Sequence, residues 1–500
     1  MQFQVIKGNY NNYILRSNES LSLDAVNHQL ACFKKFDWKK KKVMIIAEEG
    51  KGSLSAVALK QINQSIDLGD ISECCIVGTS SSTAELKHFR TANQLMASIS
   101  QSPIANAAIL MTGNDSGSIR YLERQLAFND NPMTLAVDLD AIAANVEYYR
   151  NTTKPKNKVM AMVKANAYGH GITEVAHHLK DKVAYFGVAY VYEGIVIRRA
   201  AIDTPIMVMN PSPKDFDLCI TYDLEPEIYS LSSLKSLERL LGEKKQKLGI
   251  HIEIDTGMNR LGIDLIDIDP MIQMLRTSNW IYVKGLYSHL ACAEDASEDK
   301  FNRKQLDQFN SIAAKVETAL NINTIKHVRN SAGTLRYPES PTDMVRLGIG
   351  LYGVDSNKLY QDQVKNISTL KTVISQIRTV RKGETIGYNR TFQAGKDMTI
   401  ATIAIGYADG FKRLFSNGSG QVLINGILAP VVGRVNMDMT MVDVSDCTAQ
   451  EGDKVVIFNE TLTPMLLAKK ADTIPYEIFT SVGERVKRTY RLEINRSPKM

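Results

Sequence analysis

Lys164 stands between an apolar run and a segment of small residues. The run is Val159–Val163, and the segment Ala165–Gly171 is rich in alanine and glycine. A lysine that ends a buried strand points into a desolvated pocket, where a lowered pKa makes its amine a nucleophile toward carbonyl groups. Most lysines are surface residues that aid solubility, and position alone leaves that alternative open for Lys164.

A second candidate group is Arg346-Leu-Gly-Ile-Gly350, which combines an arginine with two glycines. Glycine amides can approach an anion closely, and the loops after the last strands of a barrel are where such folds hold phosphates. A turn that enters a helix is the other interpretation of the same residues. Lys164, a phosphate cradle and Arg346 together favour pyridoxal phosphate as a cofactor, although their spacing does not decide it.

Eight short apolar or β-branched runs between Thr134 and Tyr360 would position these residues, and helical segments separate most of them. Eight parallel strands with crossover helices over roughly 230 residues form a (β/α)8 barrel, whose functional groups gather at the C-terminal ends of the strands. That rim would include Lys164, His289 and Arg346; a structural histidine is the alternative for His289. The runs are Val159–Lys164, Tyr185–Ala189, Pro205–Met209, Leu224–Tyr229, His251–Asp255, Tyr282–His289, Ile325–Asn330 and Met344–Gly348.

The flanking regions have different patterns. Residues 1–128 alternate short apolar runs with helical stretches, which predicts a small α/β domain, and the turn-rich stretch Phe128–Pro132 ends it. From about 366 the pattern is that of antiparallel strands and hairpins, with an Asn425-Gly426 turn and a short helix near Pro464–Ala471. We therefore predict an α/β protein with domains at 1–128, 134–365 (the barrel) and 366–495 (mostly β).

Composition restricts the class of protein. The 500 residues are 44% hydrophobic and 23% charged with a net charge of +6, which is compatible with a small anionic ligand and gives no support for nucleic-acid binding. The six cysteines form no CxxC pair, which argues against a metal site or a disulfide framework. We find neither an export signal nor a membrane-spanning run, so we expect a cytoplasmic protein.

Seven motifs, in order and in register, resemble those of the alanine racemase family. The resemblance covers residues 134–491, and it includes the Lys164 motif and the Arg346 motif. The motifs are Val163-Lys-Ala-Asn-Ala-Tyr-Gly-His-Gly171, Asp255-Thr-Gly-Met-Asn-Arg260, Tyr287-Ser-His289, Arg346-Leu-Gly-Ile-Gly-Leu-Tyr-Gly353, Ile405-Gly-Tyr-Ala-Asp-Gly410, Gly433-Arg-Val-Asn-Met-Asp438 and Ile474-Pro-Tyr-Glu477.

The resemblance implies a pyridoxal-phosphate isomerase that interconverts L- and D-alanine for peptidoglycan by two-base proton transfer. Lys164 would bind the cofactor covalently and act on one face of the substrate Cα, and Tyr388 would act on the other with His289 as its hydrogen-bond partner. Arg346 would face the pyridine nitrogen and, because arginine keeps its proton, leave that nitrogen unprotonated. The other implied cofactor contacts are Tyr168, Asn330, Ser331, Gly348, Ile349 and Tyr476.

For the substrate carboxylate, the resemblance implies contacts with Arg260 and the Met437 amide. It also implies a homodimer in which Tyr388 and Met437 complete the partner's barrel site. Three alternatives stay open: a racemase of broader specificity for small amino acids, a pyridoxal-phosphate-binding protein without catalysis, and an inactive enzyme that acts as a scaffold through residues 1–128. Tyr388 argues against the second, because a carrier needs no second base.

One residue and one region depart from the family pattern. At Glu253 family members commonly carry a lysine that is carbamylated, so here a shorter carboxylate is encoded directly and its reach to Arg260 is open. Residues 1–128 faintly resemble the C-terminal domain of the ligase that adds D-alanyl-D-alanine to the peptidoglycan precursor, through stretches such as Ile109-Leu-Met-Thr-Gly113. The chain lacks a G-x-x-x-x-G-K-[ST] loop for ATP, so we expect a ligase-like remnant without ligase activity.

Overall fold

The structure is a computed structural model that describes residues 2–17, 21–39, 41–48, 54–78, 86–113, 116–127, 131–153, 157–357 and 359–493. These residues form two compact units, which we describe separately. One unit contains residues 1–140, 368–463 and 482–500, and the other contains residues 141–367 and 464–481. The predicted boundary at Phe128–Pro132 and the predicted end of the β domain at residue 495 lie partly or wholly outside the described residues.

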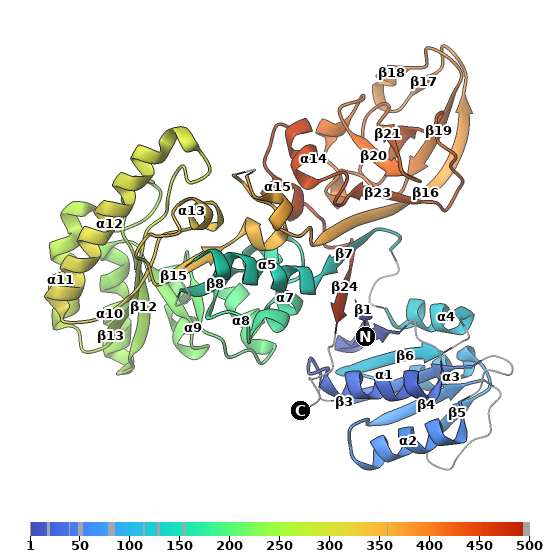
Figure 1. The fold of residues 1–500 in the computed structure, drawn as a ribbon, viewed down its shortest axis with the longest axis horizontal. Coiled ribbons are helices and arrows are strands. Elements are labelled where there is room, and N and C mark those ends of the chain that lie inside the picture. The colour runs from blue at the N-terminus through green and yellow to red at the C-terminus, as the bar shows by residue number, and fades with distance from the viewer. Residues whose placement is uncertain are drawn as a thin grey trace. The chain divides into compact units, whose positions relative to one another are not determined.

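The 141–367 unit contains an eight-stranded parallel barrel (Figure 1), in which each of the first seven strands pairs with its neighbour in the chain and the last strand pairs with the first. Between β14 and β15 isolated hydrogen bonds replace a ladder: Asp343 N–H donates to Lys326 and Arg346 N–H to Arg329, so the barrel is nearly closed. Each strand overlaps one predicted run, which confirms the fold class. The strands are β8 (Lys158–Met162), β9 (Tyr185–Val188), β10 (Ile206–Val208), β11 (Glu225–Ile228), β12 (Leu248–Glu253), β13 (Ile281–Tyr287), β14 (Ile325–His327) and β15 (Met344–Leu347).

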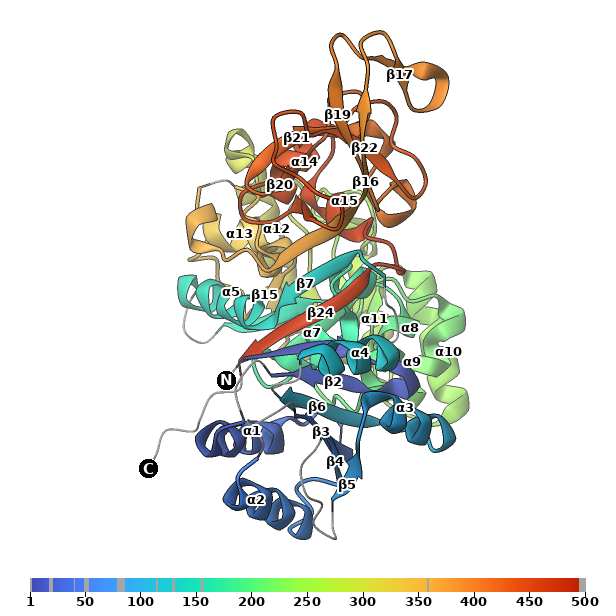
Figure 2. The same cartoon turned by 90° about the vertical axis from the view of Figure 1, so that its right-hand side faces the viewer.

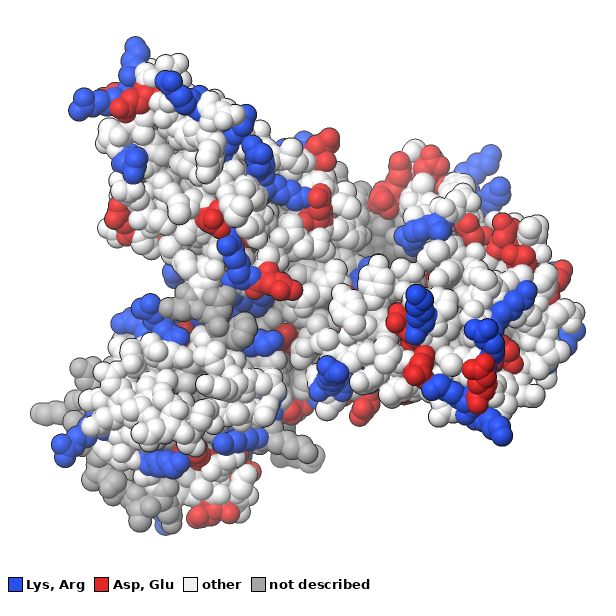
Figure 3. Space-filling model, turned by 180° about the vertical axis from the view of Figure 1, so that it is seen from behind, with Lys and Arg blue, Asp and Glu red and all other residues white. Residues whose placement is uncertain are grey.

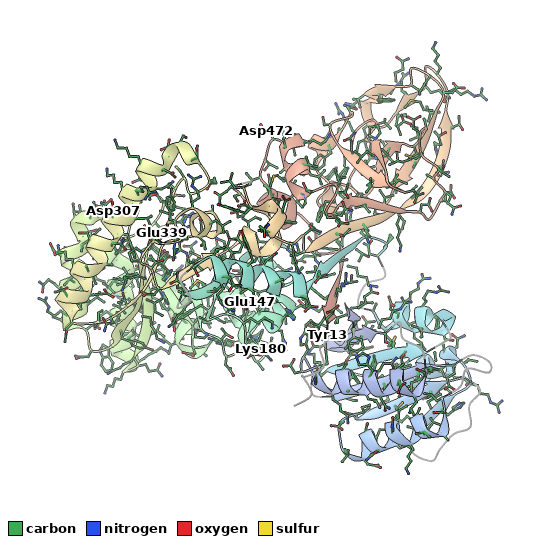
Figure 4. All side chains as sticks on the ribbon, viewed as in Figure 1. Tyr13, Glu147, Lys180, Asp307, Glu339 and Asp472 are labelled. Atoms are coloured by element: carbon green, nitrogen blue, oxygen red, sulfur yellow. The ribbon has the colours of Figure 1, made fainter. Side chains whose placement is uncertain are left out.

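Helices follow the barrel strands, as the crossovers of a parallel barrel require. In α12 the buried residues Leu306, Phe309, Ala313 and Val316 recur on one face, while Asp307, labelled in Figure 4, is exposed. This 3.6-residue period is typical of a helix that packs one face on a core. The helices of this unit include α6 (Lys164–Tyr168), α7 (Ile172–Leu179), α8 (Val191–Arg199), α9 (Phe216–Thr221), α10 (Leu231–Lys244), α11 (Ile268–Thr277), α12 (Asp299–Leu320), α13 (Ser331–Arg336), α14 (Pro464–Lys470) and α15 (Pro475–Thr480).

The C-terminal part of the other unit is mostly β. Its long strand β16 (Ser368–Val380) pairs antiparallel with three strands, namely β7 (Thr134–Asp138), β19 (Met398–Ile403) and β23 (Lys454–Phe458). The predicted hairpin is present as β20 (Gln421–Ile424) and β21 (Ile427–Pro430). Asn425 and Gly426 between them both have positive φ, as a two-residue type I′ turn requires. β22 (Thr440–Asp443) pairs with β19.

The N-terminal part is a parallel sheet in the order β2, β6, β3, β4, β5, as an α/β domain predicts. Helices α3 and α4 pack their apolar residues on one face of this sheet, and α1 and α2 pack together beside it (Figures 1 and 2). Tyr13, labelled in Figure 4, makes an edge-to-face contact with Trp38 at 5.0 Å. The elements are β2 (Tyr13–Arg16), α1 (Leu23–Lys35), β3 (Lys41–Ala47), α2 (Ala56–Asp67), β4 (Glu73–Val77), β5 (Lys87–Phe89), α3 (Ala92–Gln101), β6 (Ala107–Gly113) and α4 (Ser116–Leu126).

One strand joins the two parts of this unit into a single 14-stranded sheet. β24 (Lys487–Glu493) pairs parallel with β7 on one side and antiparallel with β1 (Gln2–Lys7) on the other (Figure 2). The sequence did not predict β1 or β24. The N-terminal strand therefore covers an edge of β24 that would otherwise present unpaired backbone groups.

Two further observations concern the charges on the surface and the hydropathy of the helices. In Figure 3 basic and acidic side chains are interspersed over the face in view, as far as the residues are described. No helix within the described ranges is both long enough and apolar enough to span a bilayer.

Candidate active site

A left-handed helical turn follows Lys164 directly. Ala165, Asn166, Ala167 and Tyr168 have φ values between 51° and 54°, and Gly169 ends the turn with a φ of 85°. For residues with a Cβ, this conformation costs about 1–2 kcal/mol each. Such strain persists only where the surrounding structure holds it, and it is typical of functional sites.

Lys164 and Tyr168 line one cavity of about 300 Å³, to which Glu193 and Tyr476 also contribute. The pKa of Lys164 is lowered because burial disfavours the ammonium form and because Arg260 and Arg346 repel it. A lowered pKa leaves more of the amine neutral at a given pH, which is the form that attacks a carbonyl. The cavity is therefore suited to a small carbonyl compound bound covalently at Lys164.

A group of hydroxyls and backbone amides lies beside Tyr168. Ser331 Oγ accepts hydrogen bonds from the amides of Gly348 (3.0 Å) and Gly350 (3.2 Å). A Cβ on Gly348 would lie 2.7 Å from the Tyr168 hydroxyl, so glycine is required for this approach. The Tyr168 ring lies 5.8 Å from the Tyr476 ring. Amides and hydroxyls that converge in this way fit a phosphate group.

Two further residues of the predicted phosphate site, Asn330 and Ile349, lie at the beginnings of short helical segments. Asn330 caps α13 because its Oδ1 accepts a hydrogen bond from the Gly333 amide at 2.8 Å. Ile349 begins the 3-10 segment Ile349–Tyr352, directly after Gly348. Both lie next in the chain to Ser331 or Gly348, so the structure brings this predicted group together within the barrel unit.

Arg346 is buried at the end of β15, with 2% of its surface exposed. Its Nη1 donates to Nδ1 of His327 (3.0 Å), and its Nη2 donates to Nδ1 of His289 (3.1 Å) and to the carbonyl oxygen of Ser288 (2.8 Å). A guanidinium has only donors, so both histidines must accept at Nδ1 and carry their proton on Nε2. His289 is therefore neutral and is a hydrogen-bond donor at Nε2.

The pKa values of His289 and His327 agree with this assignment. Both lie well below the ordinary value because the rings are buried and because Arg346 repels a second positive charge. The hydrogen bonds continue from His327. Its Nε2 lies 3.0 Å from Nδ1 of His251, and Nε2 of His251 lies 2.8 Å from Oε2 of Glu225. Arg346 is thus connected through the imidazoles of His327 and His251 to the carboxylate of Glu225.

This chain of hydrogen bonds was not among the predicted features of the site. Its signal was present as polar residues at alternate positions of buried strands, Glu225 and Glu227 in β11 and His251 and Glu253 in β12. In a strand, residues two apart share a face, so these four point into the barrel together.

Glu253 is buried, and its carboxyl group is hydrogen-bonded to that of the buried Glu227 on the neighbouring strand β11. The pKa of Glu227 is raised well above its ordinary value, because burial disfavours its charge and because it interacts with the Glu253 carboxyl. The raised pKa favours the protonated, uncharged form of Glu227. Arg260, which is exposed, interacts electrostatically with Glu227.

Tyr388 and Met437 belong to the other compact unit. Tyr388 begins the 3-10 segment Tyr388–Arg390 and is 69% exposed, and Met437 is 53% exposed. Tyr388 lines a surface cavity together with Asn436 and Met439. Exposed apolar side chains that gather beside a cavity mark a surface that binds a partner or ligand.

A lysine of lowered pKa and a group of hydroxyls and amides lie after strands of the barrel, at the C-terminal ends where barrel enzymes have their active sites. Models of the alanine racemase N-terminal and C-terminal domains match residues 137–356 and 367–490. The chain therefore belongs to the alanine racemase family, whose members are isomerases.

Individual relatives agree with this assignment. Alanine racemase 1 of Caldanaerobacter subterraneus subsp. tengcongensis is 36% identical over 72% of this chain and 95% of its own length. The alanine racemase structure from Bartonella henselae with covalently bound pyridoxal phosphate is 32% identical, with a TM-score of 0.66 over 72% of this chain and 99% of its own. The structure from Bacillus anthracis with bound L-Ala-P is 31% identical, with a TM-score of 0.67 over 72% of this chain and 95% of its own.

Proposed function

We propose that this chain racemises alanine with pyridoxal 5'-phosphate as its cofactor. The observation that carries the proposal is Lys164, whose pKa is lowered, in one cavity with Tyr168 and beside the Ser331 cradle. The Bartonella relative holds pyridoxal phosphate covalently, and the Bacillus relative binds L-Ala-P. When bound, pyridoxal phosphate withdraws electrons from the substrate Cα and makes its proton removable.

Each predicted site residue then has a role. Lys164 bonds to the cofactor; Ser331, Gly348 and Ile349 hold its phosphate, together with Tyr168, Asn330 and Tyr476. Arg346 would face the pyridine nitrogen, and its hydrogen bonds to His289 and His327 hold the guanidinium group in position. Arg260 and the Met437 amide bind the substrate carboxylate.

Lys164 and Tyr388 exchange protons with opposite faces of the substrate Cα, and His289 donates through Nε2 to stabilise the Tyr388 phenolate. We propose that Tyr388 and Met437 reach this site from a second copy of the chain, in a homodimer that shares its active sites. Their exposure in a separate compact unit supports this arrangement. The product D-alanine supplies peptidoglycan synthesis, and a cytoplasmic location, which we infer from the sequence, belongs to the same proposal.

A chiral assay of the purified protein tests the proposed reaction. With each L-amino acid in turn, we expect fast conversion to the D-form for alanine and much slower conversion for larger side chains. Comparable rates for serine and other small amino acids would instead identify a racemase of broader specificity. Stoichiometric binding of pyridoxal phosphate without conversion of any amino acid would identify a non-catalytic binding protein.

Glu253 gives a second prediction. We propose that it supplies an encoded anion for Arg260, while the raised pKa of Glu227 favours the neutral form of that neighbour. A charge-assisted contact is worth about 1.5–3 kcal/mol, so Glu253→Gln should raise the KM for alanine by about ten-fold or more. The native enzyme should be indifferent to bicarbonate, and a Glu253→Lys variant should respond to it. Native kinetics for Glu253→Gln at every alanine concentration would remove the anchoring role.

Residues 1–128 form, in our proposal, a ligase-like structural domain that is dispensable for catalysis, ahead of a barrel domain at 134–365 and a β domain at 366–495. A protein that begins at Asn129 should keep its turnover number, because no predicted site residue precedes residue 134. It should aggregate more readily than the full chain, because loss of β1 exposes the edge of β24. Loss of turnover in a folded, dimeric truncated protein would contradict the proposal, and light scattering measures the aggregation.

A further inference from the structure

Glu193 connects the ends of two neighbouring barrel strands. It lies in the first turn of α8 with 3% of its surface exposed. One carboxylate oxygen accepts the Ala165 amide at 2.6 Å, and the other accepts the amides of Ala189 (2.7 Å) and Tyr190 (3.2 Å). Ala165 follows β8, and Ala189 and Tyr190 follow β9, so one buried side chain holds both strand ends.

The Ala165 amide is the first donor of the left-handed turn. Within the turn the Ala167 amide donates to the carbonyl oxygen of Val163 (2.8 Å), and the Gly169 amide donates to the carbonyl oxygen of Ala165 (2.9 Å). The Ala165 amide takes part in neither hydrogen bond and has its acceptor outside the turn. Glu193 is that acceptor. An ionised carboxylate forms shorter and stronger hydrogen bonds to backbone amides than a neutral oxygen does, so it is suited to hold a strained conformation.

Glu193 also lies close to the Lys164 side chain. Both residues line the same cavity. Arg260 and Arg346 lower the pKa of Lys164, and Glu193 is one of the two acidic groups whose charge raises it. The same carboxylate thus acts on the backbone that carries Lys164 and on the electrostatic surroundings of its amine.

We propose that Glu193 is a positioning residue for Lys164: its carboxylate ties the left-handed turn to the end of β9 and so sets the direction in which the Lys164 side chain leaves the backbone. The inference rests on the proposed role of Lys164. It assigns to Glu193 a function in proton transfer on the face of the substrate Cα that Lys164 serves.

The test is Glu193→Gln, whose amide nitrogen cannot accept a hydrogen bond. We expect borohydride still to attach pyridoxal phosphate to Lys164, while kcat falls about 10- to 100-fold, as for a misplaced reacting group. With 2-deuterated alanine, the isotope effect should rise for the enantiomer whose proton Lys164 removes and should not rise for the other. Isotope effects that change equally for both enantiomers, or not at all, would overturn the proposal. If Glu193→Gln does not fold, Glu193→Asp, which keeps the charge and loses reach, is measured with the same expectation.

Two further variants separate positioning from general stability. Glu317→Gln removes a carboxylate that accepts the Thr324 amide at 2.8 Å before β14, at the other end of the barrel, and it should leave both isotope effects unchanged. Ala165→Gly relieves the left-handed strain, so the double variant Glu193→Gln/Ala165→Gly should regain part of the lost kcat. A double variant no faster than Glu193→Gln would overturn the positioning role. Borohydride labelling at a different lysine would instead overturn the proposed role of Lys164, which is a separate result.

Discussion

Replacing Lys164 with alanine should lower the rate of alanine racemisation on the order of 10³-fold or more, because it removes both the covalent link to the cofactor and one of the two bases. The variant should not become labelled when pyridoxal phosphate and borohydride are added, whereas the native protein should carry the label on the peptide that contains Lys164. Mass spectrometry of the digested protein identifies that peptide.

Lys158 provides the matched control, because it is an exposed lysine at the other end of the same strand, β8. Lys158→Ala should keep native labelling and native kcat. The pH dependence of labelling is a second check: the lowered pKa of Lys164 leaves more neutral amine, so capture of the cofactor should persist to lower pH than capture by an ordinary surface lysine. A label on any other lysine would disprove the assignment.

Mixing Lys164→Ala subunits with Tyr388→Phe subunits should restore activity that neither variant has alone. If the site combines Lys164 of one subunit with Tyr388 of another, a mixed dimer has one intact site. Random exchange then yields about a quarter of native activity, because half of the dimers are mixed and each has one working site of two. The assay is the rate of racemisation after subunit exchange, with mixed dimers verified by a tag on one variant.

Tyr10→Phe is the control for the loss of a phenol, because Tyr10 is an exposed tyrosine of the same compact unit as Tyr388. It should have native activity without mixing. Mixed dimers that form and stay inactive would show that the site is not shared between subunits in the proposed way.

The barrel was predictable from the sequence because each strand is a short apolar run between polar turns, and the strands from β8 to β15 overlap the eight runs. Parallel strands expose their C-terminal ends on one side, so the residues after the runs were expected to meet. Lys164, Ser331 and Arg346 do lie in one compact unit as expected. Their roles in cofactor binding came from the family motifs, and the experiments above test them.

The left-handed turn after Lys164 was not predictable, because local preference opposes it. Alanine and tyrosine disfavour positive φ, and nothing within Ala165–Tyr168 supplies a partner for the first amide of the turn. That partner is Glu193, 28 residues later in the chain. The sequence shows a glutamate near the start of a helix, and only the tertiary contact shows what it holds.

Contacts between residues far apart in the chain also explain two other features that the sequence did not predict. A strand pattern indicates which side chains are buried but not which strand lies alongside, so the pairing of β1 with β24 had no local signal. The proton positions on His289 and His327 follow only from their distances to Arg346. The sequence by itself determined the barrel strands, the helical segments between them and the order of the motifs, because these depend on local patterns of residues. The tertiary structure alone decided the strained turn, the shared sheet and the histidine tautomers, because each depends on contacts between residues far apart in the chain.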